Sequence, residues 1–329
     1  MDRKNLEKNI DEKNIKKVKS YANIAIIKYW GKKDAEKMIP ATSSISLTLK
    51  DMYTETEISF ISDEEAIEKT GEVTDLIYIN GELQDREQRQ KIGKVIDLFR
   101  ENRSERVKID TTNSMPTEAG LSSSSSGLSA AIMACNELFE KNLSRNELAQ
   151  ISKFASGSSC RSFFGPVTAW DKDTGEVYKV KTDLKFGMIM LVLNDAKKVI
   201  SSRKGMEICT KTSKTFENWV KQSEIDFIEM KKYLEENDFE KVGKLTEENA
   251  LRMHETPLTA TPSFSYLSDK SHEAMNFVRK LRENGEKCYF TMDAGPNVKV
   301  LCLEKDLDRL KETFEKKYRV IASRVVELG

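Results

Sequence analysis

Residues 115–129 read MPTEAGLSSSSSGLS, a stretch in which a loop gives way to a helix. Pro116 and Gly120 interrupt regular structure, and the small residues that follow leave backbone N–H groups uncovered. Apolar residues then recur at helical spacing from Leu128 onward. Because a helix N-terminus carries unpaired N–H groups and partial positive charge, this stretch predicts a cradle for a phosphate. A flexible serine linker is the alternative, but the run is short and an apolar helix follows at once.

The chain has 329 residues, which is enough for about two globular domains. Its 54 basic and 54 acidic residues cancel, so net charge indicates neither nucleic acid nor an anionic membrane as partner. The longest apolar run, at 186–193, is far shorter than the ~20 residues that cross a bilayer. The N-terminus is charged and unlike a signal peptide, and we therefore expect a cytoplasmic protein.

Cysteine and histidine usage argues against several classes of site. The five cysteines are an odd number without C-x-x-C spacing, which predicts reduced thiols and no zinc site: Cys135, Cys160, Cys209, Cys288 and Cys302. With only His254 and His272, a Ser-His-Asp hydrolase or a histidine-ligated metal centre is poorly supplied. We expect no cluster of metal-ligating side chains.

The N-terminal half predicts a largely antiparallel sheet with helices. We expect residues 1–17 to be a charged extension. After it come strands at 18–27, 45–50, 53–60, 76–80 and 106–111, with Asn80-Gly81 as a hairpin turn. Apolar spacing predicts a helix at 85–100, and Ser144 with Glu147 forms a capping box for a helix ending near 154.

Three further segments have the composition of binding loops. The turn at 28–34 gathers aromatics and lysines around Gly31, although a basic turn anchored by a buried Trp30 is an open alternative. Residues 156–162 place hydroxyls beside Arg161, whose guanidinium can bind a phosphate or carboxylate at two points. Residues 201–206 form a third loop of serines and cations, after a buried strand at 186–193.

The C-terminal half predicts an α+β domain. It holds three long helical patterns, followed from Cys288 by strand, turn, strand, helix and strand. Asp293 lies at the end of the first of these strands, in a turn fixed by Gly295-Pro296. That place suits chemistry, although a turn-forming role for the aspartate is the simpler alternative.

The three loops and one carboxylate together suit phosphoryl transfer. Exposed N–H groups, hydroxyls and cations can bind a nucleoside triphosphate and an anionic second substrate, and then hold the two in line. The loop at 115–129 lacks the lysine of a Walker motif, which argues against a P-loop NTPase.

The PTEAGLSSSS loop at 116–125 resembles the phosphate-binding motif of the GHMP kinase superfamily. Other motifs resemble the diphosphomevalonate decarboxylase family and follow one another in its order: NIA at 23–25, KYWGK at 28–32, SGSSCR at 156–161, SSRKGM at 201–206 and DAGPN at 293–297. The resemblance covers nearly all of the chain except the charged extension. One departure is the unbroken run of five serines, where members of the family often have intervening alanines.

This resemblance implies an α+β fold of two domains with the active site in the cleft between them. The first, at 18–185, would be a GHMP kinase ATP-binding domain like ribosomal protein S5 domain 2, and the second, at 186–329, would be ferredoxin-like. It implies ATP and Mg²⁺ as cofactors, with the metal held mainly through the ATP phosphates, and a homodimer. The implied reaction phosphorylates the 3-hydroxyl of mevalonate 5-diphosphate, and then releases phosphate and carbon dioxide to give isopentenyl diphosphate.

The resemblance also assigns roles to residues. It makes Asp293 the catalytic carboxylate, assisted by Lys32, Arg161 and Ser202. It assigns substrate binding to Tyr29, Trp30, Gly31, Lys32, Arg89, Ser156, Gly157, Ser158, Ser159, Cys160, Arg161 and Arg203. The ATP phosphates are assigned to Gly120, Leu121, Ser122, Ser123, Ser124, Ser125 and Ser126.

Two alternatives stay open at the level of sequence. One is a sister activity, either a kinase that phosphorylates the mevalonate 3-hydroxyl without decarboxylation or a decarboxylase of phosphomevalonate. The other is a metabolite sensor without catalysis on the same scaffold, against which an intact Asp293 and Lys32 argue.

Overall fold

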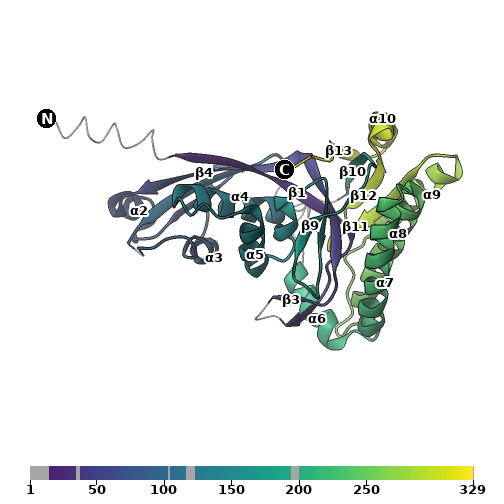
Figure 1. The fold of residues 1–329 in the computed structure, drawn as a ribbon, viewed down its shortest axis with the longest axis horizontal. Coiled ribbons are helices and arrows are strands. Elements are labelled where there is room, and N and C mark those ends of the chain that lie inside the picture. Colours follow the sequence, from purple (N-terminus) through teal and green to yellow (C-terminus); the bar gives the residue numbers. More distant parts are fainter. Residues whose placement is uncertain (1–14, 35–37, 103, 116–122, 194–199, 329) are drawn as a thin grey trace.

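The computed structural model describes residues 15–34, 38–102, 104–115, 123–193 and 200–328. Two lobes lie beside each other in Figure 1, and the long strand β1 runs from one toward the other. No helix in these described ranges is both long and apolar enough to cross a membrane.

The N-terminal lobe contains a seven-stranded sheet in the order β6-β5-β7-β4-β8-β9, with β1 added against β4. Its pairs are antiparallel except for β5 with β7. The strands are β1 (Lys16–Ile27), β4 (Ser44–Ile61), β5 (Leu76–Ile79), β6 (Glu82–Leu83), β7 (Arg106–Asn113), β8 (Val167–Trp170) and β9 (Val177–Lys179). A separate hairpin pairs β2 (Lys32–Asp34) with β3 (Ile39–Pro40). The helices are α2 (Asp63–Thr70), α3 (Arg86–Ile96), α4 (Ser123–Leu138), α5 (Arg145–Ala155) and the 3₁₀ helix η1 (Ser159–Phe163).

Several local signals in this lobe are confirmed. Asn80 and Gly81 both have positive φ, 52° and 81°, and join β5 to β6 as the hairpin signal predicts. Ser144 and Glu147 form the expected capping box. The strands expected at 45–50 and 53–60 are one strand, β4, which continues through the exposed Lys50-Asp51 step although its pairing with β1 is irregular there.

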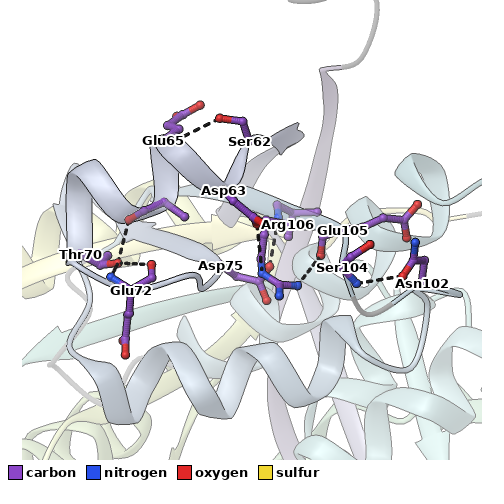
Figure 2. A network of polar contacts seen from close by, with 12 residues as sticks. Ser62, Asp63, Glu65, Thr70, Glu72, Asp75, Asn102, Ser104, Glu105 and Arg106 are labelled. Carbon is purple, nitrogen blue, oxygen red and sulfur yellow. Dashed lines mark hydrogen bonds and ion pairs between the residues drawn. The ribbon is translucent and has the colours of Figure 1, made fainter.

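The outer end of this lobe is held by its own polar contacts (Figure 2). Ser62 accepts a hydrogen bond from the Glu65 N–H and so caps α2. Asp75 accepts from the Val107 N–H at 3.0 Å, which ties the start of β5 to β7. These two contacts join residues within the N-terminal lobe.

The C-terminal lobe contains a four-stranded antiparallel sheet in the order β11-β12-β10-β13. The strands are β10 (Phe186–Val192), β11 (Cys288–Met292), β12 (Val298–Leu303) and β13 (Arg319–Arg324). The helices are α6 (Ser202–Thr212), α7 (Phe216–Glu235), α8 (Phe239–Leu258), α9 (Asp269–Glu283) and α10 (Leu307–Glu315), with the 3₁₀ turn η2 (Glu304–Asp306). The predicted order from Cys288 to the end and the three long helices are confirmed.

The two lobes share one hydrophobic core. One face of the C-terminal sheet packs with α9 and α10 around Phe290 and Phe314. The other face contributes Met188 and Leu301 to a cluster that also contains Ile24 of β1 and Phe227 of α7. Burial of apolar surface therefore stabilises the contact between the lobes as well as each lobe.

Candidate active site

Asp293 follows β11 directly, and its carboxylate contacts a lysine on each oxygen. Lys28 lies 2.7 Å from Oδ1, and Lys299 lies 3.1 Å from Oδ2. Lys28 ends the β1 segment of the N-terminal lobe, whereas Lys299 belongs to β12. Burial alone raises the pKa of Asp293, but the positive charges of Lys28 and Lys299 outweigh it and hold that pKa well below its usual range. The carboxylate is therefore ionised where the two lobes meet.

Lys28 is almost completely buried, and the sequence motifs did not single it out as a site residue. Its ammonium donates to the Ala25 carbonyl at 2.8 Å and to Asp293. Burial, with a smaller contribution from the nearby charge of Lys299, lowers the pKa of Lys28 to about 8, although Asp293 opposes the change. The side chain thus titrates close to neutral pH, which is unusual for a lysine.

A buried network behind Lys28 fixes its backbone. The Lys28 N–H donates to the Asn249 side chain at 2.8 Å. Asn249 in turn donates to Asp226 at 2.8 Å, and Asp226 also contacts Arg252 at 2.7 Å. Helices α7 and α8 therefore position a residue of the opposite lobe.

His254 of α8 is buried close to the same lysines. Burial and then the positive charge of Lys28 lower the pKa of His254 to about 3. Its ring packs edge to face on Tyr266, with centroids 6.3 Å apart. His254 is therefore neutral at physiological pH and adds no charge to the site.

Arg161 is a buried cation whose described partners are neutral oxygens. Its guanidinium donates to Ser46 at 3.0 Å, to Ser44 at 2.6 Å and to Asn23 at 3.3 Å. Asn23 lies at an irregularity in the pairing of β1, where a β-bulge redirects side chains. The charge of Asp293 acts on Arg161 from a distance, but no described carboxylate forms an ion pair with it, so this buried cation favours an anionic ligand.

Tyr29 lies against the loop before η1. Its ring occupies the space that a Cβ on Gly157 would need, at 2.7 Å, and packs on Trp170 with centroids 5.2 Å apart. The Tyr29 hydroxyl is buried without a hydrogen-bond partner among the described residues, and burial raises its pKa. A buried hydroxyl without a partner is available to a bound substrate.

Trp30 and Gly31 fix this turn in place. The Trp30 indole donates to Thr256 at 2.8 Å, and its ring lies in a buried cluster with Trp219. Of the two interpretations of Trp30, the structure has the buried anchor and does not present the ring as a binding surface. Gly31 has φ 99°, and a Cβ there would lie 2.4 Å from the Phe216 ring.

Lys32 and the start of α6 form the outer part of the site. Residues 201–206 were expected to be a loop, but Ser201 caps α6 by accepting from the Lys204 N–H, so Ser202 and Arg203 lie in the first helical turn. Both of these side chains are exposed. Burial and the positive charge of Arg203 lower the pKa of Lys32.

A cavity of about 700 Å³ lies beside Lys32. Its lining includes three more lysines, Lys33, Lys153 and Lys172, although Lys172 is paired with Asp173 and Glu224. Among the described residues, the lining does not include Asp293. The cavity is therefore a positively charged region beside Lys32 and is distinct from the Asp293 centre.

The serine cluster before Arg161 divides into two sets. Ser156 and Ser158 are partly exposed, and their hydroxyls lie 3.4 Å apart. Ser159 and Cys160 are buried and bond inward, to the Ser156 and Gly157 carbonyls. Their expected role in substrate binding is thus not supported, because a 3₁₀ helix turns them into the core. Burial also raises the pKa of Cys160 to about 12.

The serine run at the start of α4 was assigned to the ATP phosphates. Gly120, Leu121 and Ser122 lie outside the described residues. Helix α4 begins at Ser123 and has no acidic residue in its first turn, which suits an anion at its N-terminus. Ser125 and Ser126 are buried, and the Ser126 hydroxyl bonds to Thr54 at 2.7 Å. Ser123 and Ser124 lie in the first turn of α4, and their assignment to the ATP phosphates stays a prediction.

Arg89 does not join the other candidates. Its guanidinium contacts Glu72 at 2.8 Å and the Gln84 carbonyl at 2.9 Å, within the outer end of the N-terminal lobe, where Figure 2 labels Glu72. The substrate-binding role expected for Arg89 is not supported by these contacts. The described part of the chain also holds no cluster of metal-ligating side chains.

Comparisons with known proteins agree with this geometry. A model of the diphosphomevalonate decarboxylase-like N-terminal domain matches residues 20–181, and one of the mevalonate 5-diphosphate decarboxylase C-terminal domain matches residues 188–326. Mevalonate pyrophosphate decarboxylase from Streptococcus pyogenes is 59% identical, with a TM-score of 0.90 over 96% of this chain and 98% of that one. The structure of MDDEF in complex with MVAPP, AMPPCP and magnesium is 36% identical, with a TM-score of 0.86 over 95% and 97%.

A curated relative extends the comparison to a fungus. The diphosphomevalonate decarboxylase of Candida albicans is 30% identical over 318 residues, which is 90% of this chain and 86% of that protein. The two domain models together span nearly the whole described chain, and both lobes align with solved structures. This chain therefore belongs to the diphosphomevalonate decarboxylase family.

Proposed function

We propose that the chain converts mevalonate 5-diphosphate to isopentenyl diphosphate in an ATP-dependent decarboxylation, with Asp293 acting at the substrate's 3-hydroxyl. The observation that carries this proposal is an ionised carboxylate held by lysines from both lobes. The substrate is an anion at both ends, and a centre with several cations and one carboxylate matches it.

Different cations are proposed to bind different parts of this substrate. Arg161, buried among neutral oxygens, and the Tyr29 hydroxyl are proposed to bind the diphosphate together with Ser156 and Ser158. Lys32 extends this region outward toward the lysine-lined cavity. Ser202 and Arg203, exposed in the first turn of α6, are proposed to bind the substrate carboxylate.

The reaction requires a proton acceptor and then a group that tolerates positive charge. The 3-hydroxyl oxygen bonds to the γ-phosphorus of ATP as the bond from that phosphorus to the bridging oxygen breaks and ADP leaves with its electrons. The hydroxyl proton leaves to Asp293 or to a water that Asp293 positions. The C3–O bond then breaks, and phosphate leaves with the bonding electrons. Electrons from the bond between C2 and the carboxylate form the C2–C3 double bond, and carbon dioxide departs. An ionised Asp293 stabilises the positive charge that develops at C3.

The low pKa of Asp293 limits how it takes up a proton. A carboxylate held by two lysines is a weak base in the resting enzyme. The hydroxyl proton therefore becomes acidic enough to transfer only as the O–P bond forms. Asp293 thus contributes orientation and charge more than basicity.

ATP is proposed to place its phosphates at the start of α4, beside Ser123 and Ser124. Helix α4 is 16 residues long, so its N-terminal partial charge is fully developed. Bound Mg²⁺ would neutralise phosphate charge, held mainly by the phosphates and water.

One assay tests this function. Purified protein with ATP, Mg²⁺ and mevalonate 5-diphosphate should release carbon dioxide and ADP in equal amounts. ADP without carbon dioxide would leave only a 3-kinase, and turnover of the monophosphate alone would indicate a phosphomevalonate decarboxylase. Absence of ADP with the diphosphate and with the monophosphate would contradict all three enzyme activities and leave a binding protein.

The oligomeric state and compartment also belong to this proposal. A homodimer is supported by the family resemblance alone, and light scattering after size-exclusion chromatography measures it directly. A cytoplasmic location is supported by five free and buried cysteines, which suit a reducing compartment.

A further inference from the structure

The hairpin of β11 and β12 places a lysine inside the protein beside Asp293. Thr291 pairs with Lys299 across the hairpin, and Met292 pairs with Val298. Because side chains alternate along a strand, Lys299 lies on the same side as Thr291 and, two residues further on, Asp293. Lys299 is 0% exposed.

A lysine this deeply buried needs an anionic partner. Burying an unpaired ammonium costs several kcal/mol or shifts its protonation. Among the described residues, the carboxylate that contacts the Lys299 ammonium is Asp293, whose Oδ2 lies 3.1 Å away in an ion pair without hydrogen-bond geometry. Oδ1 is already occupied by Lys28. Each carboxylate oxygen therefore has its own lysine.

We propose that Lys299 is a positioning residue that fixes the rotation of the Asp293 carboxylate about its Cβ–Cγ bond. With Lys28 as its only partner, the carboxylate could rotate about the Cβ–Cγ bond, because a contact at Oδ1 does not fix the position of Oδ2. Two contacts on opposite oxygens define the plane of the group. This inference rests on the proposed role of Asp293 at the 3-hydroxyl.

The two lysines contact Asp293 from different parts of the fold. The Lys28 contact joins residues 265 apart and crosses between the lobes. The Lys299 contact lies within one hairpin. A relative movement of the lobes changes the Lys28–Asp293 distance and leaves the Lys299–Asp293 distance unchanged. Lys299 thus holds Oδ2 from within the same hairpin, and Lys28 adds the contact at Oδ1 from the other lobe.

The test replaces the ammonium by an apolar group of similar length. We expect Lys299→Met to lower kcat about 10–100-fold, as for a catalytic group misplaced by about 1 Å, while KM for mevalonate 5-diphosphate changes less than about threefold. The Lys299→Gln variant keeps an N–H donor for Oδ2, and we expect it to recover part of kcat. The acid limb of the kcat profile should move to higher pH, since Asp293 loses a positive neighbour.

The other charged or titratable groups around Asp293 would not move the acid limb of the kcat profile. Lys28 from the end of β1 and Arg161 from η1 remain positive in the acid range, and His254 from α8 remains neutral above about pH 3. A shift of the acid limb to higher pH would therefore reflect a higher pKa of Asp293.

A double-mutant cycle separates positioning from general damage. If Lys299 acts through Asp293, adding Lys299→Met to Asp293→Asn should lower kcat little further than Asp293→Asn alone. The matched control is Arg100→Met, which breaks another buried pair, with Asp75 at 2.5 Å in the N-terminal lobe. It should reduce thermal stability and leave kcat and the pH profile unchanged.

Two results would overturn the proposal. One is a Lys299→Met enzyme with wild-type kcat and pH profile. The other is a set of fully multiplicative losses in the double mutant, which would show that Lys299 acts independently. A near wild-type Asp293→Asn enzyme would instead contradict the proposed function itself, so the two failures can be told apart.

Discussion

At the scale of single residues, Asp293 is the proposed catalytic carboxylate, and its two lysines hold its pKa low. Asp293→Asn keeps the size of the side chain and removes its charge. We expect substrate affinity to persist while kcat falls by orders of magnitude, because the positive charge at C3 loses its partner. Calorimetry for binding and release of labelled carbon dioxide for turnover measure the two separately. Turnover near the wild-type rate would contradict the role given to Asp293.

Lys28 predicts a pH dependence that an ordinary lysine would not give. Its pKa is lowered from 10.5 to about 8, so the ammonium loses its proton as pH rises through about 8. If the charged form is required, kcat/KM should fall about tenfold for each pH unit above that value.

The control for this limb is Lys28→Arg. Arginine stays charged far above pH 8, so the alkaline limb should move to higher pH even if the overall rate drops. A limb that stays near pH 8 in this variant would assign the titration to another group.

The sequence indicated some of the residues around Asp293, and there are physical reasons why it did not indicate the others. The loops with Arg161 and Tyr29 and the turn with Asp293 were found because their compositions are unusual for turns. Lys28 was included in the motif at 28–32 but was given no role, although a lysine next to a buried strand was a usable signal. Lys299 offered the same signal between Val298 and Val300. The contact between Arg89 and Glu72 was not predicted, because nothing in the sequence marks Glu72 as its partner.

At the scale of elements, the turn between β1 and β2 depends on Gly31. Replacing Gly31 by alanine combines a left-handed backbone, which costs about 1–2 kcal/mol, with a clash against Phe216 that costs about 1–3 kcal/mol more. We expect a lower Tm and a raised KM, because Tyr29 and Lys32 flank the displaced residue. Thermal denaturation and steady-state kinetics measure these effects.

Gly81→Ala is the matched control for this turn. Gly81 also has a positive φ, 81°, but a Cβ there would meet nothing within 4 Å. This variant should show the backbone cost alone and leave KM unchanged. Equal losses of stability in both variants would contradict the packing of Phe216 on Gly31.

Element boundaries show where sequence patterns stop being informative. Capping boxes and hairpin turns are local, and those at Ser144 and Asn80 were predicted correctly. The continuity of β4 and the start of α6 depend on pairing and capping partners elsewhere. A polar step such as Lys50-Asp51 interrupts the apolar pattern without ending the strand, although the pairing of β4 with β1 is irregular there.

At the scale of the whole molecule, the shared core predicts that the lobes unfold together. Phe227 of α7 is 4% exposed and lies in the cluster that contains Ile24 of β1. Phe227→Ala should cost about 3–5 kcal/mol and should reduce hydrogen-exchange protection in β1, in the opposite lobe. Hydrogen exchange followed by mass spectrometry measures this effect.

Phe314→Ala tests the specificity of that coupling. Phe314 is equally buried, at 0% exposed, but it packs in the cluster of α9 and α10 within the C-terminal lobe. Its loss should leave the protection of β1 above that in Phe227→Ala at matched overall stability. Identical exchange patterns in the two variants would contradict a core shared through α7.

The ion pair between Lys28 and Asp293 also has a consequence for synthesis on the ribosome. Its partners lie 265 residues apart, so at about 5–20 residues per second the lysine emerges tens of seconds before the aspartate. During that interval the nascent N-terminal half exposes the apolar side of β1, where chaperones can bind. It also lacks the carboxylate needed for turnover, so an unfinished chain that already holds ATP has no means of completing the reaction.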